Sequence, residues 1–356
     1  MRKRILSIAL VAIMAIALLA GCSGNTGSPT TPGNPSNPSG PAPSANATVI
    51  KVPHYYAETH PVEVALNSHF KAMIEEQSEG RFVVETYPNN ILGAEKEFTE
   101  GTRMGTIEAC VASQFVSENH PILKLANMPW MFDDLETSFQ AINDDEVRLP
   151  IFEAVKESGI VGQYFLVNGI RAISNNVRPI NSLADCRGLK IRMPESSQFV
   201  DNGKALGFNV VSMPMSEIFT ALQQGVIEGQ ENPPTTLLQS GWWEVQDYVA
   251  MVTHQITFDW IGFSKSFWEK QSEADQAMLF NISKETCLEE YRLYNIAHEA
   301  DIETLKANGI EFTYPDRTEF KEAGSAVPQK YMDQYPEFKE IAEKARAKEA
   351  EYAAKR

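Results

Sequence analysis

The sequence has few cysteines, a shortage of positive charge and no apolar run long enough to cross a membrane as a helix. Four cysteines in 356 residues are too few for a disulfide scaffold. Lys and Arg number 31 against 47 Asp and Glu, for a net charge of −16, so binding to a nucleic-acid backbone is disfavoured. The 43% hydrophobic and 22% charged residues are ordinary for a globular chain. Wholesale disorder is excluded, and about two domains fit the length.

The common catalytic motifs are also absent. The chain contains no G-x-S-x-G, no H-E-x-x-H and no phosphate-binding P-loop. None of its six histidines has metal-ligand spacing, and His54 and His60, six residues apart, are better explained as loop residues. We therefore expect no cofactor and no metal, and an enzyme is disfavoured. An enzyme whose catalytic residues are scattered along the chain, outside any common motif, is the alternative.

The first 22 residues predict export. A basic start at 2–4 precedes the apolar run Ile5–Ala20, whose 16 residues fall short of the roughly 20 that a bilayer helix needs. The run ends in Leu-Ala-Gly-Cys, which resembles a bacterial lipobox. That resemblance implies removal of residues 1–21 and lipidation of Cys22. An uncleaved anchor, or a plain secretory signal with an incidental cysteine, is the alternative.

Residues 22–46 read as a flexible tether after the lipidated cysteine. Ser23 to Asn46 consists of Ser, Gly, Asn, Thr, Pro and two Ala, without charge or large apolar side chains. The expected location is therefore extracytoplasmic, on the periplasmic side or the outer face of the cytoplasmic membrane. The length of the tether mildly favours a single-membrane cell surface. A lipid anchor and a tether suit a receptor that serves a membrane protein, and equally a surface enzyme or structural lipoprotein.

From residue 47 onward, short β-rich runs alternate with helical spacing, which predicts an α/β fold with a mostly parallel sheet. Two such units with the chain crossing between them predict a ligand cleft. Strands are expected at 48–53, 82–87, 107–112, 160–167, 171–174, 189–193, 209–213 and 226–229, and helices at 62–80, 94–103, 199–206, 215–224, 273–308 and 337–356.

Three polar residues are candidates for binding an anion. Arg192 ends an apolar strand just before Pro194, where strand ends in α/β sheets face the ligand crevice, and its planar fork can hold a carboxylate. A surface arginine or a structural ion pair is the alternative, and Arg171 has the same two interpretations. Asn232, between Glu231 and two prolines, is expected in a rigid turn, either to donate to a ligand or to form the turn.

Several short motifs share one family pattern. They are N-G-I-R at 168–171, D-C-R-G-L-K-I-R-M-P at 185–194, M-P-M-S-E at 213–217, A-L-Q-Q-G-V-I-E-G-Q-E-N-P at 221–233, Y-P-N-N-I-L-G at 87–93 and M-P-W-M-F at 128–132. Together they resemble the extracytoplasmic substrate-binding proteins of TRAP (tripartite ATP-independent periplasmic) transporters, in the DctP family. The resemblance extends from Thr48 to about Tyr331.

The resemblance implies a two-domain, periplasmic-binding-protein-like fold of type II with a hinged ligand cleft. The expected boundaries are 47–168 with about 257–297 for the first α/β domain, about 169–256 with 298–335 for the second, and 336–356 for a C-terminal helix. It also implies two partners: a small carboxylate ligand, either a sugar acid or a dicarboxylate, and the subunits of a TRAP-type membrane permease. Because the chain without residues 2–4 carries a net charge near −19, local arginines must attract the acid at contact range.

The resemblance further implies which residues meet the ligand. Arg192 clamps the carboxylate, Asn232 and Arg171 assist, and Met215 lines the pocket. Ser113 occupies a ligand-facing position at which the sialic-acid-binding branch carries Glu, a difference that argues against sialic acid. Further candidate contacts are Tyr56, His60 and Trp260, with packing the safer interpretation of the tryptophan.

Two other functions remain open at this point. The same fold can present its ligand to a receptor kinase as a sensory partner. A surface enzyme or a structural lipoprotein is the third possibility, which turnover of a bound acid, or failure to bind any small molecule, would favour.

Overall fold

The computed structural model describes residues 44–356. The predicted signal peptide, Cys22 and all but the end of the predicted tether lie outside the described residues. Within 44–356, no helix combines the length and the apolar character needed to cross a bilayer.

The N-terminal part of the body is a small α/β layer. Strands β1 (Thr48–Pro53) and β2 (Phe82–Tyr87) pair in parallel, at the predicted positions. Between them run α1 (Pro61–Ala65), the π-helical turn η1 (Leu66–Lys71) and α2 (Ala72–Gln77). The helix predicted over 62–80 is therefore confirmed, with a π-helical turn inside it that the apolar spacing did not show.

A second sheet of three strands lies at the centre of the largest core cluster. Its middle strand, β10 (Ile256–Ser264), is buried along its whole length and pairs antiparallel with β3 (Ala109–Ala112) and β4 (Ile160–Ile170). The sequence prediction had no strand at β10, and its expectation of a mostly parallel sheet is wrong here. A strand buried on both faces shows no alternation of polar and apolar residues, so its period was invisible.

The third sheet has six strands in the order β11-β9-β5-β8-β6-β7. Pairs β6–β7, β6–β8 and β9–β11 are parallel, whereas β5 is antiparallel to β8 and β9, so this sheet is mixed. Its strands are β5 (Ala172–Asn175), β6 (Lys190–Met193), β7 (Asn209–Ser212), β8 (Gly229–Asn232), β9 (Tyr248–Ala250) and β11 (Glu311–Thr313). The strand expected at 226–229 begins instead at Gly229, and Asn232 ends that strand rather than lying in a turn.

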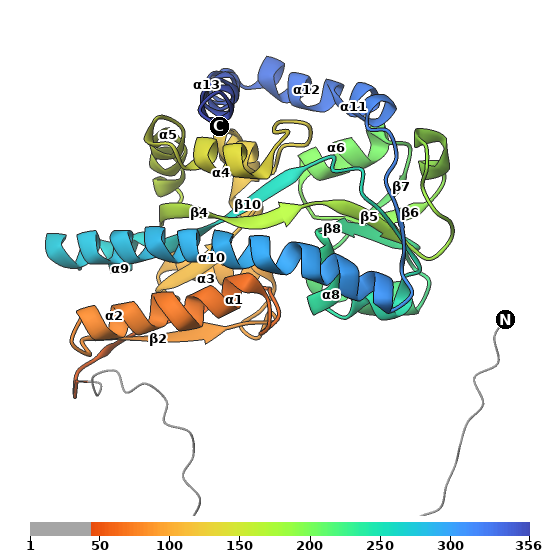
Figure 1. Ribbon diagram of the computed structural model, residues 1–356. Coiled ribbons are helices and arrows are strands. Elements are labelled where there is room, and N and C mark those ends of the chain that lie inside the picture. The colour runs from red at the N-terminus through yellow and green to blue at the C-terminus, as the bar shows by residue number, and fades with distance from the viewer. Residues whose placement is uncertain (1–43) are drawn as a thin grey trace, which may run out of the picture. The chain divides into compact units, whose positions relative to one another are not determined.

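Helices cover the three-stranded and the six-stranded sheet and connect them. In Figure 1, α11, α12 and α13 run along the top above α4 and α6, and the C-terminal helix, predicted over 337–356, is α13. The helices are α3 (Glu95–Met104), α4 (Leu135–Asn143), α5 (Asp145–Lys156), α6 (Ser197–Ala205), α7 (Ile218–Gln223), α8 (Pro234–Gln239), α9 (Lys265–Trp268), α10 (Glu273–Ala307), α11 (Thr318–Gly324), α12 (Ala326–Gln334) and α13 (Pro336–Ala353), with the short 3₁₀ turns η2 (Phe115–Glu118), η3 (Pro121–Asn127), η4 (Leu183–Cys186), η5 (Met215–Glu217) and η6 (Trp242–Val245).

The chain crosses between the two larger sheets at Arg171, which separates β4 from β5, and returns between β9 and β10. The two crossing segments are joined where the Arg171 backbone N–H donates to the Gln255 carbonyl at 2.9 Å. The 35-residue α10 passes alongside both sheets (Figure 1). From α10, the Glu290 carboxylate accepts from the Val167 N–H at 2.9 Å and the Tyr294 hydroxyl from the Ile170 N–H at 3.1 Å. The long helix thus fixes the end of β4 just before the crossing.

Apolar side chains gather in separate cores. One large cluster surrounds the three-stranded sheet, and two smaller ones pack on the six-stranded sheet. Separate cores around the two larger sheets are consistent with an α/β fold of two domains. The domain boundaries expected from the sequence stay a prediction.

Gly169 at the crossing predicts a local weakness. Its φ of +133° is unfavourable for any L side chain, and an added Cβ would lie 2.8 Å from ring carbons of Tyr294. We expect Gly169→Ala to reduce the free energy of unfolding by about 3 kcal/mol and the melting temperature by roughly 5 °C or more. The matched control is Gly101→Ala in α3, where alanine is favoured by the helix and the new Cβ meets side-chain atoms only, namely Cδ1 and Cγ1 of Ile107 at 2.8 and 3.2 Å and Oγ1 of Thr106 at 3.3 Å. Equal melting temperatures for Gly169→Ala and the unsubstituted protein would contradict this account.

Candidate functional site

A cavity of about 540 Å³ opens between the six-stranded sheet and the β1–β2 and β3–β10–β4 layers. Its volume is in the range of small-molecule sites. One wall comes from the six-stranded sheet and the segments after its strands, namely Arg171, Arg192, Pro194, Glu195, Pro214, Met215, Glu217 and Asn232. The facing wall comes from the other two layers, namely Tyr55, Asn90, Ala94, Glu95, Lys96, Glu97, Gln114, Phe115, Glu118, Asn119 and Asn168.

Strand direction brings four of the predicted residues to this cavity. Because β6, β7 and β8 run parallel, their carboxyl ends share one edge of the sheet, which places Arg192, Met215 and Asn232 there. Strand β5 runs the other way, so its beginning lies at that same edge, with Ala172 opposite Asn232. Arg171, directly before β5, completes the group. Their roles in ligand binding remain predictions, but the structure does assemble them.

Arg192 is buried and has no carboxylate partner in the described part of the chain. Only 3% of the residue is exposed, and its Nε donates to the Met213 carbonyl at 2.9 Å. Its two terminal nitrogens have no protein hydrogen-bond acceptor among residues 44–356. Burial lowers the pKa of Arg192 to about 10, so the guanidinium remains charged at neutral pH. A buried, unpaired cation on a cavity wall is suited to bind an anion.

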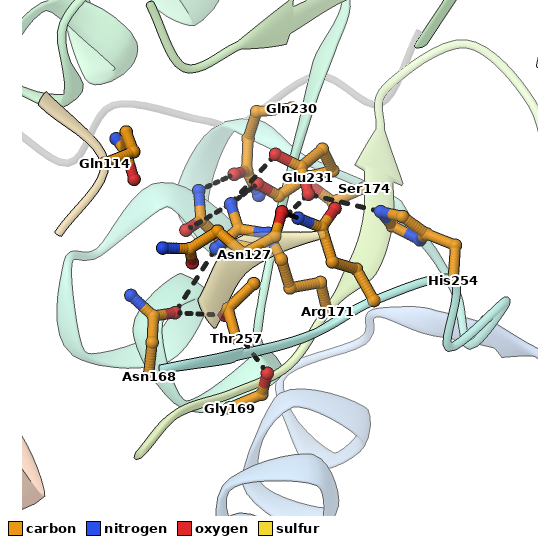
Figure 2. A network of polar contacts seen from close by, with 12 residues as sticks. Gln114, Asn127, Asn168, Gly169, Arg171, Ser174, Gln230, Glu231, His254 and Thr257 are labelled. Atoms are coloured by element: carbon orange, nitrogen blue, oxygen red, sulfur yellow. Dashed lines mark hydrogen bonds and ion pairs between the residues drawn. The ribbon is translucent and has the colours of Figure 1, made fainter. Parts of the chain in front are cut away.

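Arg171, in contrast, is already ion-paired. Its Nε and Nη2 lie 2.5 and 2.8 Å from the two carboxylate oxygens of Glu231, and Nη2 also donates to the Asn232 Oδ1 at 3.0 Å. Figure 2 shows this network, in which His254 contacts the same carboxylate at 3.2 Å. Burial alone would raise the pKa of Glu231, but Arg171 and His254 outweigh it and hold the pKa below its usual value. The structural ion pair left open for Arg171 is therefore present, and through it Arg171 orients Asn232.

Four other predicted contact residues lie beneath the wall rather than on it. The Trp260 indole N–H donates to the Ser113 carbonyl at 3.3 Å, and both residues are buried. Tyr56 donates its hydroxyl to Asp259 and stacks on His60 with ring centroids 4.1 Å apart. His60 Nδ1 accepts from the N–H of Val62 and so caps α1. The structure leaves Ser113, Tyr56, His60 and Trp260 out of the cavity lining, and their contact with a ligand stays a prediction.

The neighbours of these residues line the cavity instead. Tyr55 replaces Tyr56 and Gln114 replaces Ser113, each displaced by one position along the chain. Beneath the wall, Tyr55 and Tyr56 both donate to the Asp259 Oδ2, and the Asn168 amide donates to the two hydroxyls at 3.2 and 2.9 Å. Burial raises the pKa of Asp259. This buried network fixes the positions of the two cavity residues Tyr55 and Asn168.

Glu95, at the start of α3, is a cavity residue that the sequence analysis missed. Its Oε1 accepts from the backbone N–H groups of Ser113 at 3.2 Å and Phe115 at 2.9 Å. Burial raises the pKa of Glu95 to about 7, although the two N–H groups act in the opposite direction. A signal was available, because Glu95 comes two residues after the quoted Y-P-N-N-I-L-G motif.

A polar contact closes the rim of the cavity. Helix α6 has no cap from its own Ser196 side chain. The carboxylate of Glu118, from the facing wall, accepts from the Ser197 N–H at 3.1 Å and the Ser196 hydroxyl at 2.8 Å, which supplies the missing cap. Lys124 lies 2.7 Å from the same Glu118 oxygen and also donates to Gln198 at 3.2 Å. The two walls therefore touch through charged groups as well as through the crossing segments.

Comparison with known proteins agrees with this geometry. Residues 52–334 match the family model described as bacterial extracellular solute-binding protein, family 7. A TRAP periplasmic solute-binding protein of Haemophilus influenzae, solved with bound L-gulonate, superposes with a TM-score of 0.81 at 30% identity, over 84% of this chain and 99% of that one. A counterpart from Anaerococcus prevotii with bound D-glucuronate gives 0.82 at 28% identity, over 86% and 99%. The 2,3-diketo-L-gulonate-binding periplasmic protein of Escherichia coli is 25% identical over 271 residues, which are 75% of this chain and 82% of that protein.

The fold and the cavity define a solute-binding receptor of the two-domain, type II kind. The chain belongs to the family 7 extracellular solute-binding proteins, the DctP family of TRAP transport systems. Its relatives are substrate-binding receptors rather than enzymes.

The ion pair behind the site predicts a pH-dependent stability. We expect Glu231→Gln to reduce the free energy of unfolding by about 3 kcal/mol at neutral pH, because it leaves the buried Arg171 without its counter-charge. Since folding lowers the pKa of Glu231, the stabilisation is full above the unfolded-state pKa of about 4.3 and is lost as pH falls through the folded-state value. Chemical denaturation at several pH values tests this: the difference between the two proteins should shrink below about pH 4. Equal stability at pH 7 would refute it.

Proposed function

We propose that the chain is the extracytoplasmic receptor of a TRAP-type transport system, that it binds a small organic acid by its carboxylate, and that it passes the acid to the membrane permease. The observation that carries the proposal is the buried, unpaired guanidinium of Arg192 on the wall of the cavity. A ligand carboxylate would supply the missing counter-charge and accept two parallel hydrogen bonds.

The roles of the neighbouring residues follow from their contacts. Because Glu231 matches the charge of Arg171, Arg171 contributes a fixed position for Asn232 more than a second free cation. Asn232 donates one amide hydrogen to Gln230 at 2.6 Å and has a second available for the acid. Met215 supplies an apolar surface on the same wall. Binding requires no bond to be made or broken, and closure is driven by tighter binding in the closed state.

The solved relatives support a sugar acid as the ligand. The Haemophilus protein holds L-gulonate, the Anaerococcus protein holds D-glucuronate, and the cavity volume suits six-carbon acids of this kind. We include lipidation of Cys22 in the proposal, which would keep the receptor near its permease.

A ligand screen tests the receptor class. Protein without residues 1–22 would be heated with sugar acids, C4-dicarboxylates and other organic acids. A ligand at about 1,000 times its dissociation constant adds about 4 kcal/mol of stability, which raises the melting temperature by several degrees. No shift with any acid, combined with no acid in the supernatant of the denatured protein by mass spectrometry, would contradict the proposal.

The clamp assignment is tested at Arg192. We expect Arg192→Ala to reduce affinity for the acid found in the screen by at least about 100-fold, because a charge-assisted bidentate contact is lost. Arg192→Lys, which keeps the charge but not the fork, should retain part of the affinity. Calorimetry measures both, and circular dichroism confirms that each variant is folded. Undiminished affinity in folded Arg192→Ala would remove Arg192 from the site.

A further inference from the structure

The charges around the cavity are distributed unevenly. On the six-stranded side, Arg192 is the buried cation without an ion-pair partner among the described residues, although Glu231, Glu195 and Glu95 are near enough to raise its pKa, whereas Arg171 is paired with Glu231. The remaining cation on the lining, Lys96, is exposed and stands between Glu95 and Glu97 on α3. An exposed lysine between two carboxylates contributes little net attraction for an anion. The cavity therefore has one buried position for a carboxylate.

The facing wall offers an acceptor. Two backbone N–H groups hold Oε1 of Glu95, so this carboxylate has a fixed orientation. Its other oxygen, Oε2, accepts no hydrogen bond from residues 44–356. This oxygen is not sealed inside the protein, so it is accessible from the cavity. Asp259 is near enough to raise the pKa of Glu95, and Arg192 is near enough to lower it. A ligand group that reaches this wall must donate a hydrogen bond to be accommodated.

We propose that Glu95 makes this receptor selective for acids with a single carboxylate and a hydroxylated far end, and that it rejects the matching diacids. The inference rests on the proposed function, because it takes the carboxylate on Arg192 as given. A hydroxyl at the far end donates to the Glu95 carboxylate in a charge-assisted hydrogen bond. A second carboxylate at that end meets like charge once Glu95 is ionised and finds no second buried cation, because Arg192 already holds the first carboxylate.

Three sugar acids with one carbon skeleton provide the test. D-Glucuronate, L-gulonate and D-glucarate differ in the oxidation state of one terminal carbon, which is a cyclic hemiacetal, an alcohol or a second carboxylate; the two open-chain acids, L-gulonate and D-glucarate, give the direct comparison. At about pH 8.5, where Glu95 is ionised, we expect the unsubstituted protein to bind the better of the two monoacids at least about tenfold more tightly than D-glucarate. In Glu95→Gln, which keeps an oxygen to accept from the two N–H groups, the two affinities should come within about threefold of each other. Glu100→Gln, on the same helix but outside the cavity lining and paired with Arg103, is the matched control and should leave the ratio unchanged.

The pH dependence provides a second readout that does not need a variant. Burial raises the pKa of Glu95 to about 7, so protonation should weaken the rejection as pH falls from about 8.5 to about 6. The other titratable and charged groups around Glu95 are Asp259 on β10, Tyr55 after β1, Cys110 on β3, Arg192 on β6, and Lys96 and Glu97 on α3. The change in ratio with pH should disappear in Glu95→Gln, which separates Glu95 from these neighbours.

The outcomes distinguish this inference from the proposed function. If the protein binds a monoacid but binds D-glucarate equally well, or if Glu95→Gln keeps the full ratio, the selectivity assignment is wrong and the receptor function stands. The assignment is supported if D-glucarate binds more tightly to Glu95→Gln than to the unsubstituted protein, and if Arg192→Ala still abolishes that binding. If the protein binds no acid of any kind, the proposed function fails and this inference fails with it.

Discussion

The positive charge of Arg192, held inside the protein without a protein counter-ion, is the constraint on which the binding site depends. Two arginines lie at one edge of the six-stranded sheet; Glu231 forms an ion pair with Arg171 alone, although it is near enough to Arg192 to raise the pKa of that group. That ion pair serves to position Asn232, whereas Arg192 keeps two terminal nitrogens for an anion. An uncompensated buried charge is costly to the fold. Under our proposal, a ligand carboxylate supplies the ion-pair partner that the described residues do not give Arg192, and so relieves part of that cost.

Arg192 lies on one wall of the cavity, close to the segments that connect the two larger sheets. The chain crosses between the two larger sheets at Arg171, next to residues that line the cavity, and α10 holds the end of β4 through Glu290 and Tyr294. At the rim, Glu118 caps α6 from the facing wall. A ligand that bridges Arg192 and the wall of Glu95 joins the same two sides. Under our proposal, ligand contacts and protein contacts would both join the two sides of the cavity, and tighter binding in the closed form is what a hinged receptor requires.

Much of this arrangement could be predicted from the sequence, for identifiable reasons. Strands with clear alternation or sharp boundaries, such as Phe82–Tyr87, were placed correctly. Arg192 could be singled out because its strand ends at a proline. Strand β10 is buried on both faces, so its residues show no alternation of polar and apolar side chains by which to predict it. The strand order of the mixed sheet depends on pairing between strands far apart in the sequence. The sequence could not tell that Tyr55 rather than Tyr56 lines the cavity. The positions of both side chains depend on Asp259, which accepts from both hydroxyls and comes more than 200 residues later.

The most direct test of the central claim is the stability of the unliganded protein with Arg192→Met, measured by chemical denaturation beside the binding affinity of the same variant. Methionine has similar length and no charge, so it fills the position without an uncompensated cation. The account predicts that this variant loses acid binding and is at least as stable as the unsubstituted protein without ligand, with a gain of about 1 kcal/mol or more. A variant that is clearly less stable without ligand would show that the charge of Arg192 supports the fold, and would contradict the assignment of that charge to the ligand.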